Sequence, residues 1–415
     1  MISELKIRNF KSLESVDLKL GHFNLLVGAN ASGKSNFLDA LRFLQGVGNG
    51  FSIQGILNGV PQTSTSVRWD GIRGGTKFVA FRKPDGSDSG KDEFHVTFSD
   101  LAIGSFASDQ LMYSLTWAIK DGVISVLSES LRSGTGIPII DEKTPYLVPF
   151  TVKELDEFTE PDDPLRKTEY TWDLREAWPS ISSWSHAEYP PGIAAKCSRT
   201  VSSNLSDMQF LDLLPAVLRN YSSKVARLGE LGEGFAALVH EITSNGSKPS
   251  LLEWLKELRP DEVDDIYALE GLNNDFMVAI KEGNKELRAP VLSEGTLRFI
   301  ALAAAFFQPS MPKVLVIEEI EKGLHPSRLR LLLDLMRSQS KRTGTQVFAT
   351  THSPTLLAWL TEEDRKTTFV CTRDAESGAT KMRSLAEIPR FEELLEEGSH
   401  IDELFAEGWL ESAPQ

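Results

Sequence analysis

The sequence predicts a mixed α/β fold that carries an antiparallel β lobe and is interrupted by a largely helical insertion. Three observations lead to this prediction. Near the N-terminus a short apolar strand, Phe23–Val27, runs into a glycine-containing loop and then into an amphipathic helix. Short β-favouring segments follow between residues 76 and 127. After a helical middle part, apolar strands alternate with helices from Phe276 to Thr372.

The first part of the fold, residues 1–130, begins with two alternating segments that predict a pair of strands around Asn9-Phe10-Lys11-Ser12. Asn36–Leu44 places apolar side chains at helical spacing, whereas Gly46–Gly75 is rich in Gly, Ser, Thr and Asn and is expected to be loop. The segments predicted to form one antiparallel sheet are Thr76–Arg82, Glu93–Phe98, Met112–Ile119 and Val123–Leu127.

The insertion is placed at residues 131–270. Its Thr144–Pro191 stretch is rich in Pro, Trp and Asp and resists assignment, whereas Asp207–Ala268 has the spacing of amphipathic helices. The α/β pattern resumes over residues 271–385, and an acidic helical tail occupies 386–415. The elements predicted there are strands at Phe276–Lys281, Lys313–Ile317, Gln346–Ala349 and Thr368–Thr372 and helices at Gly295–Phe307 and Pro326–Gln339.

The composition is that of a globular protein: 415 residues, 41% hydrophobic, 25% charged, with a net charge of −15. No apolar run approaches the roughly twenty residues of a membrane span, and the alternating, acid-containing N-terminus is unlike a signal peptide. Two distant cysteines, Cys197 and Cys371, indicate a reduced, cytoplasmic protein. The negative charge argues against a generally basic nucleic-acid-coating protein, but a local basic face could still bind DNA.

The loop after the first apolar strand has the spacing of a phosphate-binding P-loop, Gly28-Ala29-Asn30-Ala31-Ser32-Gly33-Lys34-Ser35. Its backbone N–H groups can form a nest for phosphate oxygens, and the next helix points its positive dipole end at the same anion. Lys34 would reach the β- and γ-phosphates, and Ser35 would bind Mg²⁺. A coincidental glycine turn is the alternative, but the strand-to-helix context favours binding and hydrolysis of ATP with Mg²⁺.

Two carboxylates follow the apolar strand Val314–Ile317, which predicts that they lie at the carboxyl edge of a buried parallel sheet. Phosphoryl transfer needs one carboxylate in the Mg²⁺ shell and another group to orient the attacking water. Glu318 suits the first role and Glu319 the second. In isolation, two solvated glutamates would be the simpler interpretation.

His352 follows another core strand, Gln346–Ala349 and Thr350-Thr351, and would lie near the γ-phosphate as a hydrogen-bond donor. A single histidine is more often structural. The position of His352, just after a second core strand that follows the carboxylate pair, favours the functional role instead. Ser293 and Gly295 open the helix that ends near Phe307. A serine there is commonly just a helix cap, although Ser and Gly can also offer donors to a phosphate.

The order of these motifs resembles the ABC-type ATPases of the SMC/RecF/OLD branch, the bacterial "AAA family ATPase" group. The P-loop comes first, Leu292-Ser293-Glu294-Gly295-Thr296 resembles the signature, and Glu318-Glu319 and His352 follow. The run Ile7–Leu13 and the run Glu318–Pro326 are similar to that group too. The resemblance covers residues 1 to about 100 and 275 to 385.

The resemblance implies roles for individual residues. Glu319 would be the catalytic glutamate and His352 the switch histidine. Ser293 and Gly295 would contact the γ-phosphate bound to a second subunit, and His325 would fall in the loop that contacts the opposite subunit. ATP would then be held between two copies in a homodimer or a larger even-numbered homo-oligomer with two-fold symmetry.

The sequence departs from the family pattern in two places. The usual Asp before the catalytic glutamate is Glu318, and the second signature residue is the acid Glu294 instead of Gly. Both changes affect the surroundings of an anionic ligand. We therefore expect slow hydrolysis, with ATP binding as the main switch.

The resemblance also implies partners. Only about sixty residues follow His352, and they lack the acidic pattern of a Toprim nuclease. Relatives without that domain are often paired with a separate nuclease or other effector in bacterial anti-phage defence. The expected function is an ATP-dependent scaffold or sensor that controls such an effector, for example a nuclease of the Toprim type. The acidic segment Phe391–Glu397 is a candidate docking helix, with a solvated face as the simpler alternative.

Two other functions are kept open. The alternative is a RecF/SMC-like clamp that binds DNA in repair or maintenance, and a transporter ATPase is a more distant third. A clamp predicts DNA-stimulated ATPase activity and binding that weakens steeply with salt. The acidic balance and the lack of a basic stripe favour the scaffold.

Overall fold

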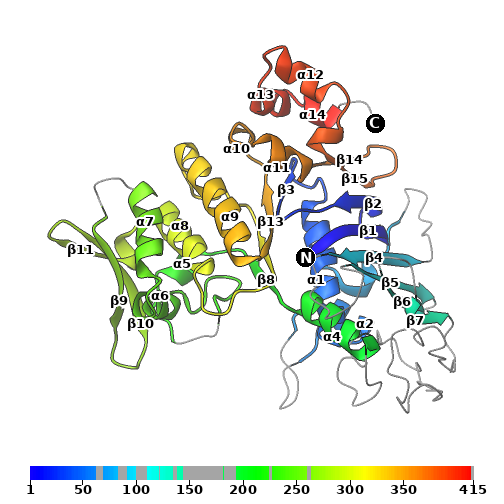
Figure 1. The fold of residues 1–415 in the computed structure, drawn as a ribbon, viewed down its shortest axis with the longest axis horizontal. Helices are drawn as coiled ribbons and strands as arrows, with labels where there is room; N and C mark the ends of the chain where they lie inside the picture. The colour runs from blue at the N-terminus through cyan, green and yellow to red at the C-terminus, as the bar shows by residue number, and fades with distance from the viewer. Residues whose placement is uncertain are drawn as a thin grey trace. The chain divides into compact units, whose positions relative to one another are not determined.

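The structure is a computed structural model that describes residues 1–61, 69–82, 91–99, 110–120, 122–133, 138–143, 181, 193–223, 227–258 and 263–412. Its helices and strands are labelled in Figure 1. The chain divides into two compact units that alternate along the sequence. Unit 1 consists of Met1–Gly21, Ala29–Met208 and Val370–Arg383, and unit 2 consists of His22–Gly28, Gln209–Phe369 and Ser384–Gln415.

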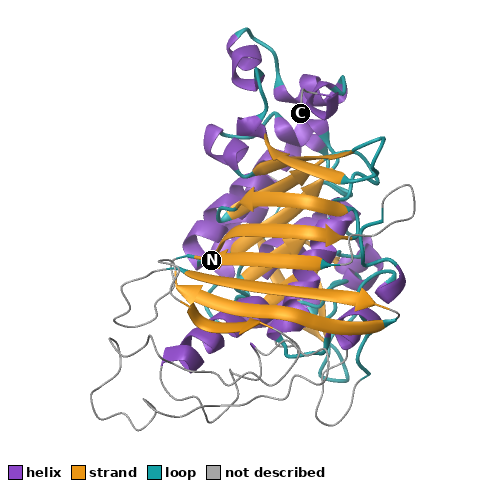
Figure 2. Cartoon of the chain, turned by 90° about the vertical axis from the view of Figure 1, so that its right-hand side faces the viewer, coloured by secondary structure: helices purple, strands orange, loops and turns teal. Residues whose placement is uncertain are grey.

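Unit 1 is built around a six-stranded antiparallel sheet in the order β2-β1-β4-β5-β6-β7, which Figure 2 shows face-on. Burial alternates residue by residue along β4 and β5, because successive side chains of a strand point to opposite faces of the sheet. The strands are β1 (Ile2–Phe10), β2 (Leu13–Lys19), β4 (Asp92–Phe98), β5 (Leu111–Lys120), β6 (Val123–Ser133) and β7 (Pro138–Lys143). This sheet is the predicted antiparallel lobe.

Helix α1 (Lys34–Gly48) is anchored in unit 1 by an aromatic cluster. The ring of Phe43 stacks on Phe94 of β4 and on Trp117 of β5, with centroids 4.8 and 5.5 Å apart. Phe10 of β1 meets Phe94 edge-on at 5.3 Å, and all four side chains are buried. Aromatic pairs in these geometries stabilise more than their buried area alone would, so the cluster fixes α1 to the lobe.

Three smaller elements complete the description of unit 1. They are α2 (Ile53–Asn58), the 3-10 helix η1 (Gly75–Lys77) and α4 (Ile193–Ser206). Helix α4 approaches α1 so closely that a Cβ on Gly48 would lie 2.4 Å from the backbone nitrogen of Ser206. Only glycine permits this approach.

Unit 2 contains the parallel core of the molecule. Strand β13 (Gln346–Thr351) pairs in parallel with β3 (Phe23–Val27) on one side and β12 (Val314–Ile317) on the other. Every residue of these three strands is buried, as expected for a parallel sheet covered on both faces. The whole sheet has the order β15-β14-β3-β13-β12-β8, with β8 (Met208–Leu211), β14 (Thr368–Arg373) and β15 (Thr380–Ser384) at its ends.

Helices cover this core. Helix α9 (Leu329–Thr343) packs on β3 and β13, and α8 (Glu294–Ala305) is almost entirely buried. A second, antiparallel sheet of order β11-β10-β9 packs on α6. The remaining elements of this part are α5 (Pro215–Leu218), α6 (Phe235–Ser244), α7 (Lys248–Leu258), β9 (Asp265–Glu270), β10 (Phe276–Glu282), β11 (Lys285–Arg288), η3 (Ala289–Val291) and η4 (Pro326–Arg328).

Short helices form the C-terminal part of unit 2, drawn in orange to red in Figure 1. The predicted acidic tail is helical, but it forms several short helices instead of one. Phe391 is fully buried, and Glu392 forms a 2.9 Å ion pair with Arg365. The helices are α10 (Pro354–Leu357), α11 (Glu362–Lys366), α12 (Phe391–Glu396), α13 (Ile401–Ala406) and α14 (Trp409–Ser412), with the 3-10 helix η5 (Leu385–Glu387).

Two segments differ from the expected secondary structure near the P-loop. Gly46–Gly75 is not only loop, because α1 continues to Gly48 and α2 forms where the Ser52 side chain caps it by accepting from the Gly55 N–H. Thr76–Arg82 is not a strand. It holds the end of η1 and isolated bridge residues, among them Ala80 opposite Phe10, since Gly74 and Gly75 turn the chain there with positive φ.

Asp207–Ala268 is less helical than expected. It begins with the buried strand β8 and runs into β9 at its end. Short apolar runs of this length cannot be assigned to strand or helix by periodicity alone. Apart from Ile181, the Thr144–Pro191 stretch that resisted assignment lies outside the described residues.

Both cysteines are buried. Desolvation raises the pKa of the Cys197 thiol to about 11 and that of Cys371 to about 12, so neither is a reactive thiolate near neutral pH. Within the described ranges, no helix combines the length and apolarity needed to cross a membrane.

Candidate nucleotide-binding site

The P-loop begins at Gly28, directly after β3, and ends at Ser35 in the first turn of α1. Ala31 and Gly33 adopt left-handed backbone conformations, with φ of 64° and 106°. Such residues turn successive N–H groups of a short loop toward one side, which is the geometry of an anion nest. Residues 29–31 are exposed, so a ligand can reach the loop.

The first turn of α1 continues this geometry. The carbonyl of Gly33 accepts hydrogen bonds from the N–H groups of Asn36 and Phe37 at 2.9 and 3.1 Å. The ammonium group of Lys34 donates to the carbonyl of Ala29 at 2.9 Å, so its charge lies against the loop. Together with the positive end of the helix dipole, Lys34 makes this loop attractive to an anion.

Thr380, the first residue of β15, holds the P-loop and the β1–β2 turn together within unit 1. Its hydroxyl donates to the carbonyl of Ser32 at 3.0 Å and lies 2.6 Å from the hydroxyl of Ser12. Asn36 donates to the same Ser12 oxygen at 2.6 Å. A Cβ on Gly33 would lie 1.9 Å from the Thr380 hydroxyl, so Gly33 is required by packing as well as by its positive φ.

These residues fit a phosphate ligand with Mg²⁺. The hydroxyl of Ser32 is buried and has no hydrogen-bond partner in the described part of the chain, which leaves a donor available at the loop. Ser35 is exposed, so its hydroxyl can be a metal ligand. No group of three or more His, Cys, Asp or Glu side chains among the described residues could hold a metal, but Mg²⁺ commonly uses few protein ligands beside phosphates and water.

An ionic cluster around the buried carboxylate of Asp39 supports the first turns of α1; Lys11 is buried with it, whereas the Arg73 side chain is 56% exposed. Lys11 donates to Asp39 at 2.5 Å and to the carbonyl of Arg73 at 2.7 Å. Arg73 donates to Asp39 at 3.1 Å and to the carbonyl of Ser35 at 2.8 Å. Burial lowers the pKa of Lys11, and its hydrogen bond to Asp39 opposes that shift. The cluster therefore links the β1–β2 turn, α1 and the loop of Arg73.

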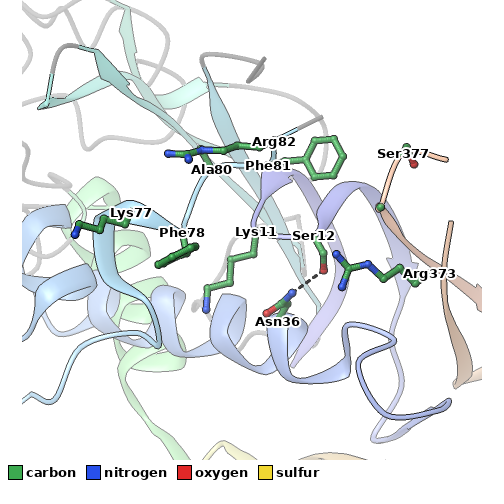
Figure 3. A pocket seen from close by; sticks show the side chains of 11 residues that line it. Lys11, Ser12, Asn36, Lys77, Phe78, Ala80, Phe81, Arg82, Arg373 and Ser377 are labelled. Atoms are coloured by element: carbon green, nitrogen blue, oxygen red, sulfur yellow. Dashed lines mark hydrogen bonds between the residues drawn. The ribbon is translucent and has the colours of Figure 1, made fainter. Parts of the chain in front are cut away.

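A cavity of about 300 Å³ opens in unit 1 beside Asn36. In Figure 3 the dashed hydrogen bond between Asn36 and Ser12 lies between Arg373 and the ring of Phe78. Phe78 is 67% exposed, and none of the described residues that line the cavity is acidic. Lining residues are Lys11, Ser12, Asn36, Lys77, Phe78, Ala80, Phe81, Arg82, Arg373, Ser377 and Gly378. Its chemistry suits a flat or anionic ligand group.

The two predicted carboxylates follow β12 in unit 2. The N–H of Glu318 donates to the carbonyl of Leu211 at 2.9 Å, and the N–H of Glu319 donates to the hydroxyl of Thr350 at the same distance. Glu319 has a positive φ of 47°, a conformation that costs a residue with a Cβ about 1–2 kcal/mol. The contact with Thr350 holds this strained turn, and such strain is concentrated at functional sites.

The carboxylate of Glu319 remains accessible. Its side chain is 42% exposed, and its nearest cation is Lys322 at 3.7 Å. Lys322 also lies 3.6 Å from Asp212, so its charge is shared. Exposed ion pairs at these distances contribute little to the stability of the fold. The Glu319 carboxylate can therefore exchange its contact with Lys322 for a contact with a ligand.

His352 follows β13 and is held by Glu321, a residue that the sequence analysis did not select. The Nδ1 atom of His352 lies 2.9 Å from Oε1 of Glu321, and the backbone N–H of His352 donates to the same oxygen at 2.8 Å. The side chain of Glu321 is 10% exposed, whereas that of His352 is 47% exposed. Glu321 therefore fixes the ring at one nitrogen and leaves its other edge toward solvent.

The predicted signature residues open α8. The Ser293 hydroxyl caps the helix by accepting from the Thr296 N–H at 3.2 Å, so the simpler role foreseen for it is present. A Cβ on Gly295 would lie 2.4 Å from the carbonyl of Gly323. Glycine is thus needed at 295 for the close contact between α8 and the loop after Glu319.

Two further residues lie nearby in unit 2. Glu294, the acid in place of glycine, lies 3.6 Å from Arg219, which offsets part of its charge. His325 is exposed in the loop before η4.

Several supporting residues were missed, for different reasons. The sequence does indicate a role for Asp39, because it is an acid on the apolar face of the predicted helix Asn36–Leu44 and a buried carboxylate needs a partner. No sequence pattern indicates the roles of Thr380 and Glu321, because their partners come from distant parts of the chain.

Two family models match the chain. The one described as "AAA domain, putative AbiEii toxin, Type IV TA system" matches residues 132–358, and "AAA ATPase domain" matches residues 1–95. An "ATP/GTP phosphatase" of Helicobacter pylori (strain ATCC 700392 / 26695) is 23% identical over 382 residues, which covers 89% of this chain and 90% of that protein. A DNA replication and repair protein RecF of Glaesserella parasuis serovar 5 is 50% identical over 44 residues, 10% of this chain and 12% of that protein.

A solved structure has the same fold. The Smc head bound to the C-winged helix domain of ScpA matches with a TM-score of 0.53 at 14% identity, over 92% of this chain and 98% of that one. At this identity the likeness concerns the fold alone. It confirms the fold class predicted from the sequence, an ATPase head with a mixed sheet, flanking helices and an antiparallel β lobe.

The buried cluster at Asp39 gives a stability prediction. Asp39→Asn leaves Lys11 buried without its counter-charge, and breaking a buried ion pair in this way costs about 3–5 kcal/mol. The free energy of unfolding, measured with urea by circular dichroism, should fall accordingly. The control is Asp17→Asn, which removes the half-exposed partner of Arg8 and should cost at most about 1 kcal/mol. Equal losses for both variants would show that the cluster has no special role.

Proposed function

Because the chain belongs to the AAA-domain family and is an ABC-type ATPase of the SMC/RecF branch, we propose that it binds ATP at its P-loop and dimerises around it. In this proposal it hydrolyses ATP slowly and acts as a scaffold or sensor switch for a separate effector protein. The hydrolytic part is supported by the Helicobacter pylori relative named "ATP/GTP phosphatase".

One observation carries the ATPase proposal. Three neighbouring parallel strands of unit 2, β3, β13 and β12, end at the same edge of their sheet. The next residues are Gly28 of the P-loop after β3, His352 after β13, and Glu318 and Glu319 after β12. Ligands of open α/β sheets bind at this carboxyl edge. The arrangement supports a site in which all three segments act on one phosphate chain.

Each residue has a proposed task. The N–H groups from Asn30 to Gly33 and the ammonium of Lys34 would bind the phosphates, and Ser35 and Glu318 would hold Mg²⁺. Bound Mg²⁺ would offset the negative charge on the β- and γ-phosphate oxygens. The carboxylate of Glu319 would accept a hydrogen bond from the attacking water and orient it. His352 would donate a hydrogen bond to the γ-phosphate.

A second copy would complete the site. Ser293 and Gly295 would approach the γ-phosphate bound to the other copy, and His325 would contact that copy beside them. The exposure of His325 and the tight contact of Gly295 with Gly323 support this, because they place the signature turn and the His325 loop next to each other. Glu294 beside the same phosphate would disfavour tight closure, which supports slow turnover.

The cavity beside Asn36 is proposed to take the nucleoside end of ATP. Asn36 directly follows Ser35, so the cavity begins one residue beyond the proposed Mg²⁺ ligand. The exposed ring of Phe78 can stack on a base, and Arg373 can donate to ribose or phosphate oxygens. No acidic side chain lines it to repel the phosphates.

The regulatory part of the proposal rests on charge and on the family description. A net charge of −15 disfavours a DNA-coating role. The description of the matching family names a putative toxin of a Type IV TA system, which favours action together with another gene product. We propose that this product is an effector such as a nuclease and that the pair acts in antiviral defence. The short match to RecF keeps a DNA clamp as the second candidate.

Glu319→Gln tests the catalytic assignment. The amide cannot take the proton of the water, so turnover should fall by about 100-fold or more, while ATP still binds. An ATP-bound dimer should then accumulate and be seen by light scattering. Phosphate release measures turnover, and Glu393→Gln on α12 serves as a surface control that should match the unaltered protein. Unchanged turnover in Glu319→Gln would remove Glu319 from the catalytic role.

Phe78→Ala tests the nucleoside cavity. Loss of base stacking costs about 1–3 kcal/mol, so KM for ATP should rise about fivefold or more, with kcat nearly unchanged. Val123→Ala removes a similarly exposed apolar side chain of unit 1 and should leave KM as it was. If the two variants have the same KM, the base binds elsewhere.

Partner and DNA can be separated in one set of measurements. The scaffold predicts that the product of the neighbouring gene co-purifies at fixed stoichiometry with Glu319→Gln in ATP, and not with Lys34→Ala, which lacks the phosphate-binding ammonium. It also predicts that duplex DNA leaves the ATPase rate unchanged. DNA-stimulated turnover with steeply salt-dependent binding, and no co-purifying protein, would support the clamp instead.

A further inference from the structure

One oxygen of Glu321 receives two contacts from His352. Oε1 accepts the backbone N–H of His352 at 2.8 Å and lies 2.9 Å from the ring nitrogen Nδ1. The other oxygen, Oε2, is buried without a hydrogen-bond partner in the described part of the chain. The buried guanidinium of Arg298 interacts electrostatically with the Glu321 carboxylate. Glu321 is therefore a fixed hydrogen-bond acceptor for His352.

This geometry restricts the hydrogens of the imidazole ring. A carboxylate oxygen accepts hydrogen bonds and does not donate them, so Nδ1 must carry a hydrogen to make its contact with Oε1. A neutral ring with its hydrogen on Nδ1 has a bare lone pair at Nε2, which would repel a phosphate oxygen. Only a doubly protonated ring donates from both nitrogens, and the negative charge of Glu321 balances that state.

We propose that Glu321 is a positioning residue that presents His352 to the γ-phosphate as a cation donating from Nε2. The inference rests on the proposed ATPase function and adds a residue to it. Glu321 lies between Glu319 and the loop that ends at His325, so it also ties the orientation of His352 to the segment that carries the catalytic carboxylate. Carboxylates also fix functional histidines through one ring nitrogen in hydrolases and metal sites, although there the other ring nitrogen is left as a base or a metal ligand.

Glu321→Gln separates orientation from charge. The amide oxygen stays on the His352 N–H, because an amide NH₂ there would face another donor. Nδ1 then keeps its hydrogen while the balancing charge is gone, so the neutral ring turns a bare Nε2 to the phosphate. We expect kcat to fall about 10- to 100-fold with a smaller change in KM.

The test compares Glu321→Gln, His352→Ala and the double variant by phosphate release, with Glu363→Gln as a surface control. If Glu321 acts through His352, adding Glu321→Gln to His352→Ala causes no further loss. Nitrogen-15 NMR of labelled histidine, assigned by the signal missing in His352→Ala, should show Nε2 protonated in the unaltered protein and unprotonated in Glu321→Gln. Melting temperatures show whether each variant is folded.

The outcomes distinguish this inference from the proposed function. If His352→Ala is impaired and Glu321→Gln is not, or if Nε2 keeps its hydrogen in Glu321→Gln, the positioning role is wrong and the switch histidine stands. If His352→Ala turns over ATP normally, the role of His352 is wrong and that of Glu321 falls with it. Additive losses in the double variant would assign Glu321 a structural role independent of His352.

Discussion

The buried carboxylate of Asp39 is the constraint on which the P-loop half of this protein depends. An ionised group with its side chain 4% exposed is stable only with cations beside it, and here Lys11 and Arg73 supply them. Lys11 belongs to the β1–β2 turn and Arg73 bonds the carbonyl of Ser35. The need to neutralise one acid therefore brings three separate segments to the first turn of α1. Because the helix end is already held in this way, it would lose little conformational freedom when a phosphate ligand binds.

The carboxylate and histidine segments of unit 2 follow a different principle. Their backbone is held by hydrogen bonds between loops that leave adjacent parallel strands, as between Glu319 and Thr350. The close contact of Gly295 with Gly323 joins the start of α8 to the same loop, and Arg298 donates to the carbonyl of Glu319 from within α8 at 3.3 Å. A displacement of α8 would therefore shift the backbone of the loop that carries Glu319. Under the proposed function, this contact would let the start of α8 transmit the nucleotide state to a partner.

Much of this architecture could be predicted because its signals are local. The all-apolar run of β3, the glycines of the P-loop and the spacing of α1 are each complete within a dozen residues. The acids after β12 and the histidine after β13 were found because a parallel sheet brings its carboxyl ends to one edge. Prediction was less successful where short segments had no decisive period. The four-residue strand β8 was taken for helix, and Thr76–Arg82, which alternates like a strand, is held by turns at Gly74 and Gly75.

By itself, then, the sequence determined the class of fold, and it predicted the P-loop, the two acids and the histidine as site residues. Tertiary structure alone decided what holds them. Thr380 bonds Ser32 across 348 positions of sequence, Glu321 meets His352 across 31, and Gly295 is small because Gly323 is close. Such contacts depend on the distance between side chains after folding, which no local pattern encodes. The P-loop could be recognised from eight consecutive residues, but the residues that support it could be identified only from the folded structure.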